Sequence, residues 1–233
     1  MRIAGAVALL LSGLTAAHGQ ICPEPLASAR RLVLVTASDM NTPSATIERF
    51  ERAGDAWKSV APAQPALIGR NGMAWSHAFR ALSRHGEPIK VDGDKRAPAG
   101  FYRIGASFGF APSPRPNYLH VREGTVCVDE PASPAYNTIT TRAKIGSGVH
   151  AENMWRVPAY KHGLLVDYPT DRKNGAGSCI FIHIRMPDAK HTSGCVAVPE
   201  AQVLELQDFA EGGAVLAILP EQARSRISCL PQR

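Results

Sequence analysis

The chain has 233 residues, of which 45% are hydrophobic and 20% charged, and its formal net charge is +6 at pH 7. This composition is ordinary for a globular protein, and the length suits one core with loops or two small domains. The basic residues are scattered singly or in pairs rather than gathered with aromatic residues, which argues against a nucleic-acid-binding protein. A mildly basic protein suits an anionic polymer such as a cell wall, although simple solubility explains the charge equally well.

The first residues are typical of an export signal. Arg2 gives a positive start, the short apolar run AGAVALLLSGL follows, and small residues near Ala17 and Gly19 offer a cleavage site. This run is shorter than the roughly 20 apolar residues that a membrane-spanning helix needs, and no later segment is long enough either. We expect a signal peptide over residues 1–19 and a single domain over residues 20–233, exported to the periplasm or cell envelope without an integral membrane segment.

The rest of the chain contains many short strand patterns and few helical ones. Apolar and β-branched runs predict strands, which in chain order are RLVLVTAS, YLHV, TVCV, GLLVDYP, CIFIHIRM and AVLAIL. The segment IERFERAGDAWKSV fits either one helix or, because AGD lies midway like a turn, a hairpin. A helix is expected from Pro199 and Glu200 to Gly212 and Gly213. Together with abundant Gly and Pro, these patterns predict one mostly β domain.

The strand CIFIHIRM has two different faces. Alternation places four apolar residues on one face: Ile180, Ile182, Ile184 and Met186. The other face carries Cys179, Phe181, His183 and Arg185. We expect His183 and Arg185 to point toward the more polar surface of the protein.

The five cysteines are Cys22, Cys127, Cys179, Cys195 and Cys229. In an oxidising compartment most cysteines are paired, and an odd number leaves one over. Cys22 and Cys229 lie at opposite ends of the expected mature chain, and the ends of one domain are often close in space, so we expect them to form a disulfide. A bond between Cys127 and Cys179 is a guess, and Cys195 is the candidate free thiol.

The segment HTSGCVAVPE gives Cys195 the surroundings of a nucleophile. Gly194 lets the backbone approach a substrate closely, Thr192 and Ser193 add hydroxyls, and the helix start that follows favours a thiolate. The base that activates such a thiol is usually a histidine, and His183 lies twelve residues upstream.

Other interpretations of these residues stay open. His191 competes with His183 as the partner of Cys195, since spacing alone does not separate them. The same three residues are also possible metal ligands, but their spacing matches no familiar zinc signature, so no metal is expected. A disulfide-bonded Cys195 in a β domain without catalysis is a further alternative.

The segment HIRMPDAKHTSGCVAV resembles the signature of the L,D-transpeptidase catalytic domain (YkuD) family, in which a histidine precedes Ser/Thr-x-Gly-Cys by about a dozen residues. The similarity extends over most of the chain, from about Leu67 to Pro220. It is carried by an ordered series of segments: GRNG, DGDKRAPAG, FGF, CVDEPASPAYN, HAENMWR and LLVDYP.

The resemblance implies a mixed β-sandwich with short helices and an enzyme that needs no cofactor. Cys195 would attack a carbonyl of a peptidoglycan stem peptide, release the terminal D-alanine, and pass the acyl group from its thioester to an amine of a second stem. His183 would be the general base and acid, and the backbone at Gly194 would hold the oxyanion. A carbonyl or hydroxyl of Thr192 or Ser193 would orient the imidazole.

The sequence also departs from the family pattern. Many members carry an arginine two residues after the cysteine, where this chain has Ala197, so an anchor for a substrate carboxylate is missing. Arg185, Arg70 or Arg156 could replace it. Other candidates for contact with the substrate are Glu152, Asp167 and Tyr168.

Two further functions remain possible at the same site. Water in place of the amine would make the protein an L,D-carboxypeptidase or an endopeptidase, and loss of the chemistry would leave a wall-binding module. Retention of both His183 and Cys195 argues against the module. The sequence leaves the oligomeric state open, and a monomer is favoured.

Overall fold

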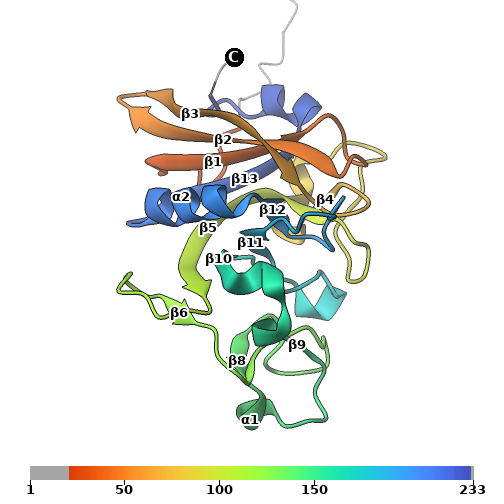
Figure 1. Ribbon diagram of the computed structural model, residues 1–233. Helices are drawn as coiled ribbons and strands as arrows, with labels where there is room; N and C mark the ends of the chain where they lie inside the picture. The colour runs from red at the N-terminus through yellow and green to blue at the C-terminus, as the bar shows by residue number, and fades with distance from the viewer. Residues whose placement is uncertain (1–20, 232–233) are drawn as a thin grey trace, which may run out of the picture.

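The computed structural model describes residues 21–231, so the predicted signal peptide lies outside the described residues. Within this range the protein is mostly β, as predicted, with a ten-stranded and a three-stranded sheet. Figure 1 shows the large sheet in the upper part of the molecule and the small sheet below it. No helix among residues 21–231 is long and apolar enough to cross a membrane.

The large sheet closes on itself. Its strands, in spatial order, are β10 (His162–Val166), β11 (Phe181–Ile184), β12 (Val196–Val198), β3 (Ala56–Leu67), β2 (Ser44–Ala53), β1 (Arg31–Ala37), β13 (Val215–Pro220), β5 (Ala97–Gly109) and β4 (Met73–Trp75), with β6 (Leu119–His120) attached to β5. Because β10 pairs with β5 as well as with β11, the strands from β10 to β5 close into a ring, and β4 is attached to β5 outside it. The architecture is therefore barrel-like, and the pairing does not confirm the predicted mixed β-sandwich.

The segment that fitted either a helix or a hairpin forms a hairpin. Strands β2 and β3 pair antiparallel along their whole length, and Gly54 in the turn has a φ of +60°, which glycine adopts without steric cost. Ala45, Ile47 and Phe50 are the buried residues of β2, so this strand has one face in the core and one in solvent.

Helix α2 (Glu200–Ala210) begins directly after Pro199 and packs on β10 and β11. Its buried side includes Val203, Leu206 and Ala210. The buried amide of Gln207 donates to the carbonyls of Phe108 (3.1 Å) and Gly163 (2.9 Å). The helix is thus fixed to the strand pair that closes the barrel.

The small sheet lies at one end of the barrel, and short helices connect several of the strands. The small sheet consists of β8 (Ile139–Thr141), β7 (Thr125–Val128) and β9 (Ala151–Asn153), and the second α-helix, α1 (Arg142–Ile145), follows β8. The 3-10 helices are η1 (His77–Leu82), η2 (Met154–Arg156), η3 (Pro158–Lys161), η4 (Arg172–Asn174) and η5 (Glu221–Arg226).

Two apolar clusters meet at β11. The larger fills the barrel and includes Ile180, Ile182 and Ile184 from one face of this segment. The smaller lies on the opposite face and is built from Phe108, Val121, Cys127, Met154, Ala159, Tyr160, Phe181 and Cys195. The face expected to be polar is therefore largely apolar, because η3 and the small sheet pack over it.

Two disulfides cross-link the described residues. Cys22 is bonded to Cys229, as predicted from their positions at the two ends of the chain. Cys127 in β7 is bonded to Cys179, just before β11, so this bond ties the small sheet to the barrel. Cys195 is the free cysteine, and it is buried.

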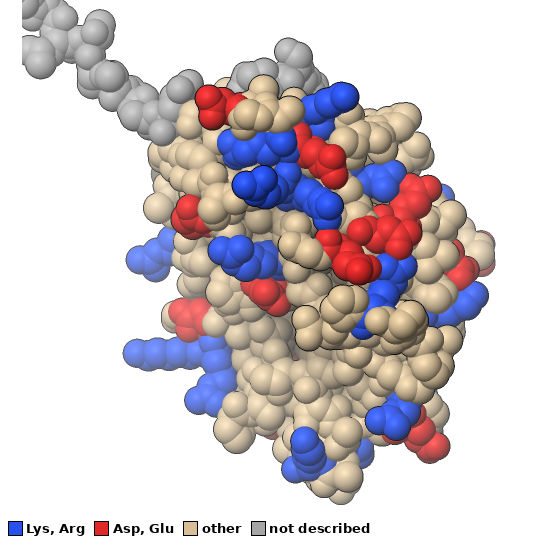
Figure 2. Space-filling model, turned by 90° about the vertical axis from the view of Figure 1, so that its left-hand side faces the viewer, with Lys and Arg blue, Asp and Glu red and all other residues tan. Residues whose placement is uncertain are grey.

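The surface carries charges of both signs. On the face shown in Figure 2, Lys and Arg alternate with Asp and Glu over the upper part, and the lower part is mostly uncharged. This face therefore has no extended patch of one sign.

Candidate active site

Cys195 directly precedes β12, where the chain enters the barrel from the His191–Gly194 loop. Strand β12 pairs parallel with β11, and the register sets Cys195 beside Phe181. The Phe181 N–H donates to the Cys195 sulfur (3.4 Å), and the thiol donates to the Cys179 carbonyl (3.5 Å). The sheet therefore holds the thiol in one position.

The thiol is held in its protonated form. The exposed fraction of Cys195 is 9%, and burial raises its pKa to about 12. The hydrogen bond from the Phe181 N–H and the charge of Lys90 lower this pKa, whereas the charge of Glu152 raises it further. A nearby base must therefore take the proton if this sulfur is to act as a nucleophile.

His183 lies on the same face of the β11–β12 pair as Cys195. The register pairs His183 with Ala197, two residues after Cys195, and alternate residues of a strand share a face. The imidazole also packs edge-on against the ring of Tyr160, with 5.5 Å between ring centroids. No hydrogen bond joins His183 and Cys195, although both lie within the described residues, so proton transfer requires a closer approach than this structure has.

The backbone fixes the tautomer of His183. Nδ1 lies 3.0 Å from the Ile184 carbonyl, which can only accept, so Nδ1 carries the proton and Nε2 keeps its lone pair. Burial lowers the pKa of His183, and the bond to Ile184 opposes that effect. The imidazole is therefore a neutral base at pH 7. In this structure the Ile184 carbonyl, and neither Thr192 nor Ser193, makes the hydrogen bond to the imidazole.

Thr192 instead shapes the loop around the thiol. Its hydroxyl donates to the Cys195 carbonyl (2.6 Å) and accepts from the Gly194 N–H (3.0 Å). The Gly194 N–H, predicted to hold the oxyanion, is thus occupied, whereas the Cys195 N–H has no partner among the described residues. Ser193 is exposed beside them. Gly194 has a φ of +146°, and a Cβ there would lie 3.1 Å from the Arg96 carbonyl, so the tight loop requires glycine.

Cys195 lines a cavity of about 420 Å³ with charges of both signs. Its charged lining residues are Lys90, Asp92, Lys95, Asp129 and Glu152. Of these, only Glu152 was a candidate from the sequence. Asp129 lies in CVDEPASPAYN, one of the segments that resemble the family, and this position was the signal for it, whereas nothing in the sequence around Lys90 sets it apart from a surface lysine.

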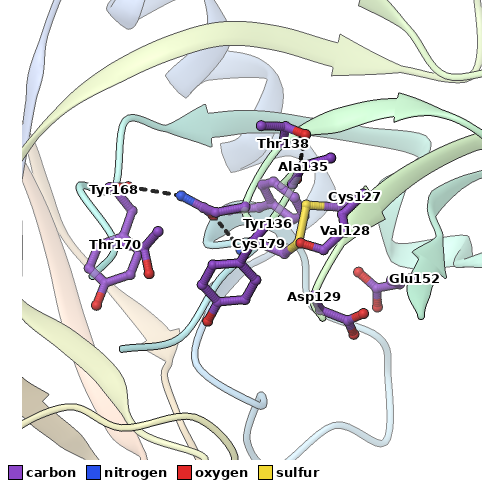
Figure 3. Close-up of a disulfide and its surroundings, with 12 residues drawn as sticks. Cys127, Val128, Asp129, Ala135, Tyr136, Thr138, Glu152, Tyr168, Thr170 and Cys179 are labelled. Atoms are coloured by element: carbon purple, nitrogen blue, oxygen red, sulfur yellow. Dashed lines mark hydrogen bonds between the residues drawn. A yellow bond between two sulfur atoms is a disulfide. The ribbon is translucent and has the colours of Figure 1, made fainter. Parts of the chain in front are cut away.

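Glu152 and Asp129 form the acidic wall of this cavity. The Tyr160 hydroxyl donates to Glu152 (2.8 Å). Burial raises the pKa of Glu152, the bond from Tyr160 lowers it, and the charge of Asp129 raises it again. In Figure 3 the two carboxylates lie together beside the Cys127–Cys179 disulfide.

Two other predicted substrate residues, Asp167 and Tyr168, line a separate cavity of about 680 Å³ that shares Cys179 with the first. The Tyr168 hydroxyl donates to the Ala176 carbonyl (2.6 Å) and so holds the chain there. Figure 3 shows Tyr168 on the opposite side of the disulfide from the acidic wall. The Asn137 side-chain amide donates to the Tyr168 carbonyl, and its oxygen accepts from the Cys179 N–H.

The candidate arginines lie outside the Cys195 cavity. Arg70 donates to His191 (3.0 Å), the histidine that competed with His183 in the sequence, and Arg156 stacks over the ring of Trp155 at 4.4 Å. Arg185 follows β11 on the His183 face without lining the cavity. No group of three or more His, Cys, Asp or Glu residues that could hold a metal ion occurs among residues 21–231.

Comparison with known proteins identifies the family. The L,D-transpeptidase catalytic domain (YkuD) family matches residues 63–218, about two thirds of the chain, and the protein therefore belongs to this family. Crystal structures of the helical cell shape determining protein Pgp2 from Campylobacter jejuni, and of a mutant of it, are similar at 14% identity with a TM-score of 0.43. The similarity covers 82% of this chain and 48% and 47% of the two Pgp2 chains. This protein therefore spans about half the length of Pgp2. No curated protein matches the chain.

Proposed function

We propose that this protein is an exported cysteine acyltransferase, an L,D-transpeptidase, that acts on peptidoglycan stem peptides. The observation that carries the proposal is the free thiol of Cys195, which lines a charged cavity on the same strand-pair face as a neutral His183. Membership of the L,D-transpeptidase catalytic domain family supplies the reaction and the substrate class.

The first half-reaction forms a thioester. His183 Nε2 takes the thiol proton as Cys195 Sγ attacks the carbonyl before the terminal D-alanine, and the Cys195 N–H donates to the oxyanion. One such donor typically contributes about 3 kcal/mol to stabilising the transition state. When the C–N bond breaks, the imidazolium returns the proton to the departing amine, and D-alanine leaves.

The second half-reaction uses the same groups in the opposite direction. An amine of a second stem attacks the thioester, His183 removes its proton, and Cys195 leaves as the thiol. The high pKa of Cys195 and the low pKa of His183, both due mainly to burial, keep the resting pair neutral. The thiolate of Cys195 and the imidazolium of His183 therefore form only when bound substrate brings the two side chains together.

The same thioester attacked by water gives the runner-up function, an L,D-carboxypeptidase or endopeptidase. The chemistry at Cys195 and His183 is identical in both cases, so the products decide between them. Export of a single domain fits the two disulfides, since such bonds persist in oxidising compartments.

The proposal is tested by intact-mass spectrometry of the protein incubated with a tetrapeptide muropeptide. We expect an adduct with the mass of the stem minus D-alanine, present in the wild type and absent in Cys195→Ala. Ser193→Ala serves as the matched control at the exposed neighbouring position and should still form the adduct. A cross-linked dimer in the same reaction identifies a transferase and a shortened monomer identifies a hydrolase. Absence of the adduct with an intact thiol would contradict both.

A further inference from the structure

Lys90 is a buried lysine that the proposed chemistry does not use. Only 3% of its surface is exposed. Its ammonium group donates to Asp94 (2.8 Å) and to the Val91 carbonyl (2.8 Å). An ammonium has three N–H donors, and these bonds use two of them, so one donor remains.

The remaining donor lies at the wall of the Cys195 cavity. Lys90 and Gly177 both line this cavity, and a Cβ on Gly177 would lie 2.8 Å from Lys90 Nζ. The absence of a side chain at position 177 therefore makes room for the ammonium at this wall of the cavity. Its charge also acts on Cys195, where it lowers the thiol pKa against the larger effect of burial.

The ion pair with Asp94 does not by itself explain why the lysine is buried. Asp94 also accepts from the Val91 N–H (3.0 Å) and the Arg96 N–H (2.8 Å), so the loop already satisfies this carboxylate. Burying a charged ammonium costs free energy that a single ion pair often fails to recover. A fixed cation at the wall of a cavity is better suited to an anionic ligand.

Few other groups in this cavity could bind an anionic ligand. Ala197, at the position where many relatives carry an arginine, is 1% exposed and is paired with His183 inside the sheet. The cavity's positive lining residues among residues 21–231 are Lys90 and Lys95, and Lys95 is an exposed side chain with no hydrogen bond or ion pair among the described residues to fix it. Lys90 is therefore the preorganised cation of this cavity.

We propose that Lys90 is a specificity-determining residue that binds a carboxylate of the donor stem peptide. This assignment rests on the proposed function and adds to it the group that recognises the substrate's negative charge. Two carboxylates are available on such a peptide, the one on the terminal residue and the one on the diamino-acid side chain, and an ammonium recognises both by the same chemistry.

The test compares the intact tetrapeptide with two analogues, one amidated at its terminal carboxylate and one at the diamino-acid carboxylate. We expect the wild type to favour the intact peptide over one of them by about 10- to 100-fold in kcat/KM, the size of one charged hydrogen bond. In Lys90→Met, kcat/KM for the intact peptide should fall by this factor. For the analogue that already lacks the bound carboxylate, kcat/KM should stay close to the wild-type value. The sensitive analogue identifies which carboxylate is bound.

Two variants separate recognition from loop structure. Asp94→Asn removes the ion pair but keeps the ammonium, so it should retain the preference for the intact peptide. Lys95→Met removes the exposed cation of the same cavity and should also retain it. If Lys90→Met does not fold, Lys90→Arg keeps the charge but alters its reach and should change the preference ratio.

Two results would overturn the assignment. One is a wild type that forms the Cys195 adduct equally well from all three peptides. The other is a Lys90→Met variant that loses the same factor on every peptide. A wild type that forms no adduct with any peptide instead contradicts the proposed function itself.

Discussion

The two faces of the segment around β11 are both buried, yet they serve different purposes. Ile182 and Ile184 belong to the main hydrophobic core. Phe181 and His183 lie on the other face with Cys195 and Tyr160, next to a charged cavity. Burial on the first face stabilises the fold. Burial on the second keeps a thiol protonated and an imidazole neutral.

His183→Gln should have the largest effect, and this effect should be on the rate of thioester formation and not on stability. The amide keeps most of the side-chain volume but provides no base of suitable pKa, so thioester formation should fall by about 10²- to 10⁴-fold. Rapid-quench mass spectrometry of the Cys195 adduct measures this rate, and the melting temperature should stay close to that of the wild type. Adduct formation within about tenfold of the wild type would mean that another base acts.

Ile182→Ala, one residue away on the opposite face, should reverse the pattern. Ile182 is fully buried, and truncation of such a side chain typically costs 2–5 kcal/mol of unfolding free energy, about 3 on average. Urea denaturation measures this loss, and Ile182→Val is the matched control, with an expected cost of about 1 kcal/mol. The folded Ile182→Ala protein should still form the adduct, and a large loss of that rate would mean that the faces are coupled.

The thiol itself should make the fold sensitive to alkaline pH. The pKa of Cys195 is raised from 9.0 to about 12 in the folded protein, so the unfolded state releases its proton first as the pH rises. Stability from this group is fully present below pH 9 and decreases toward pH 12. Between pH 9 and 10.5 the wild type should lose roughly 2 kcal/mol relative to Cys195→Ala. Parallel denaturation curves for the two proteins across this range would show that the thiol is not desolvated.

Tyr160→Phe should give the smallest effect. It removes the hydroxyl that donates to Glu152 and keeps the ring that packs on His183 and Phe181. Loss of one hydrogen bond to a buried carboxyl should cost about 1–2 kcal/mol in denaturation. Adduct formation should change by no more than a few-fold, because the ring continues to position His183. Unchanged stability would mean that water replaces the hydroxyl.

The sequence predicted the local features of this fold well. Alternation in CIFIHIRM separated the two faces of β11, Pro199 and the glycine pair marked the ends of α2, and the AGD turn correctly offered a hairpin. Closure of the barrel was not predictable in this way. It depends on pairing between β5 and β10, which are far apart in the chain, and no local pattern encodes that contact.

The sequence proposed candidate residues for the site but could not predict their surroundings. The motif selected Cys195 and His183 from residue types and spacing. The polar face expected around His183 was wrong because η3 and the small sheet cover it, and such coverage is a tertiary effect. The orienting role of the Ile184 carbonyl depends on a side-chain rotamer, and Lys90 acquires its burial from a loop that folds against Gly177.

The Cys22–Cys229 bond makes the covalent connectivity of the protein nearly circular, because it joins two residues with a sequence separation of 207. A single proteolytic cut anywhere within this ring leaves one covalent molecule under non-reducing conditions and two fragments after reduction. A cut between Cys127 and Cys179 leaves its two sides linked by a second path as well. The protein can therefore be nicked in an exposed loop without losing either half of the candidate active site.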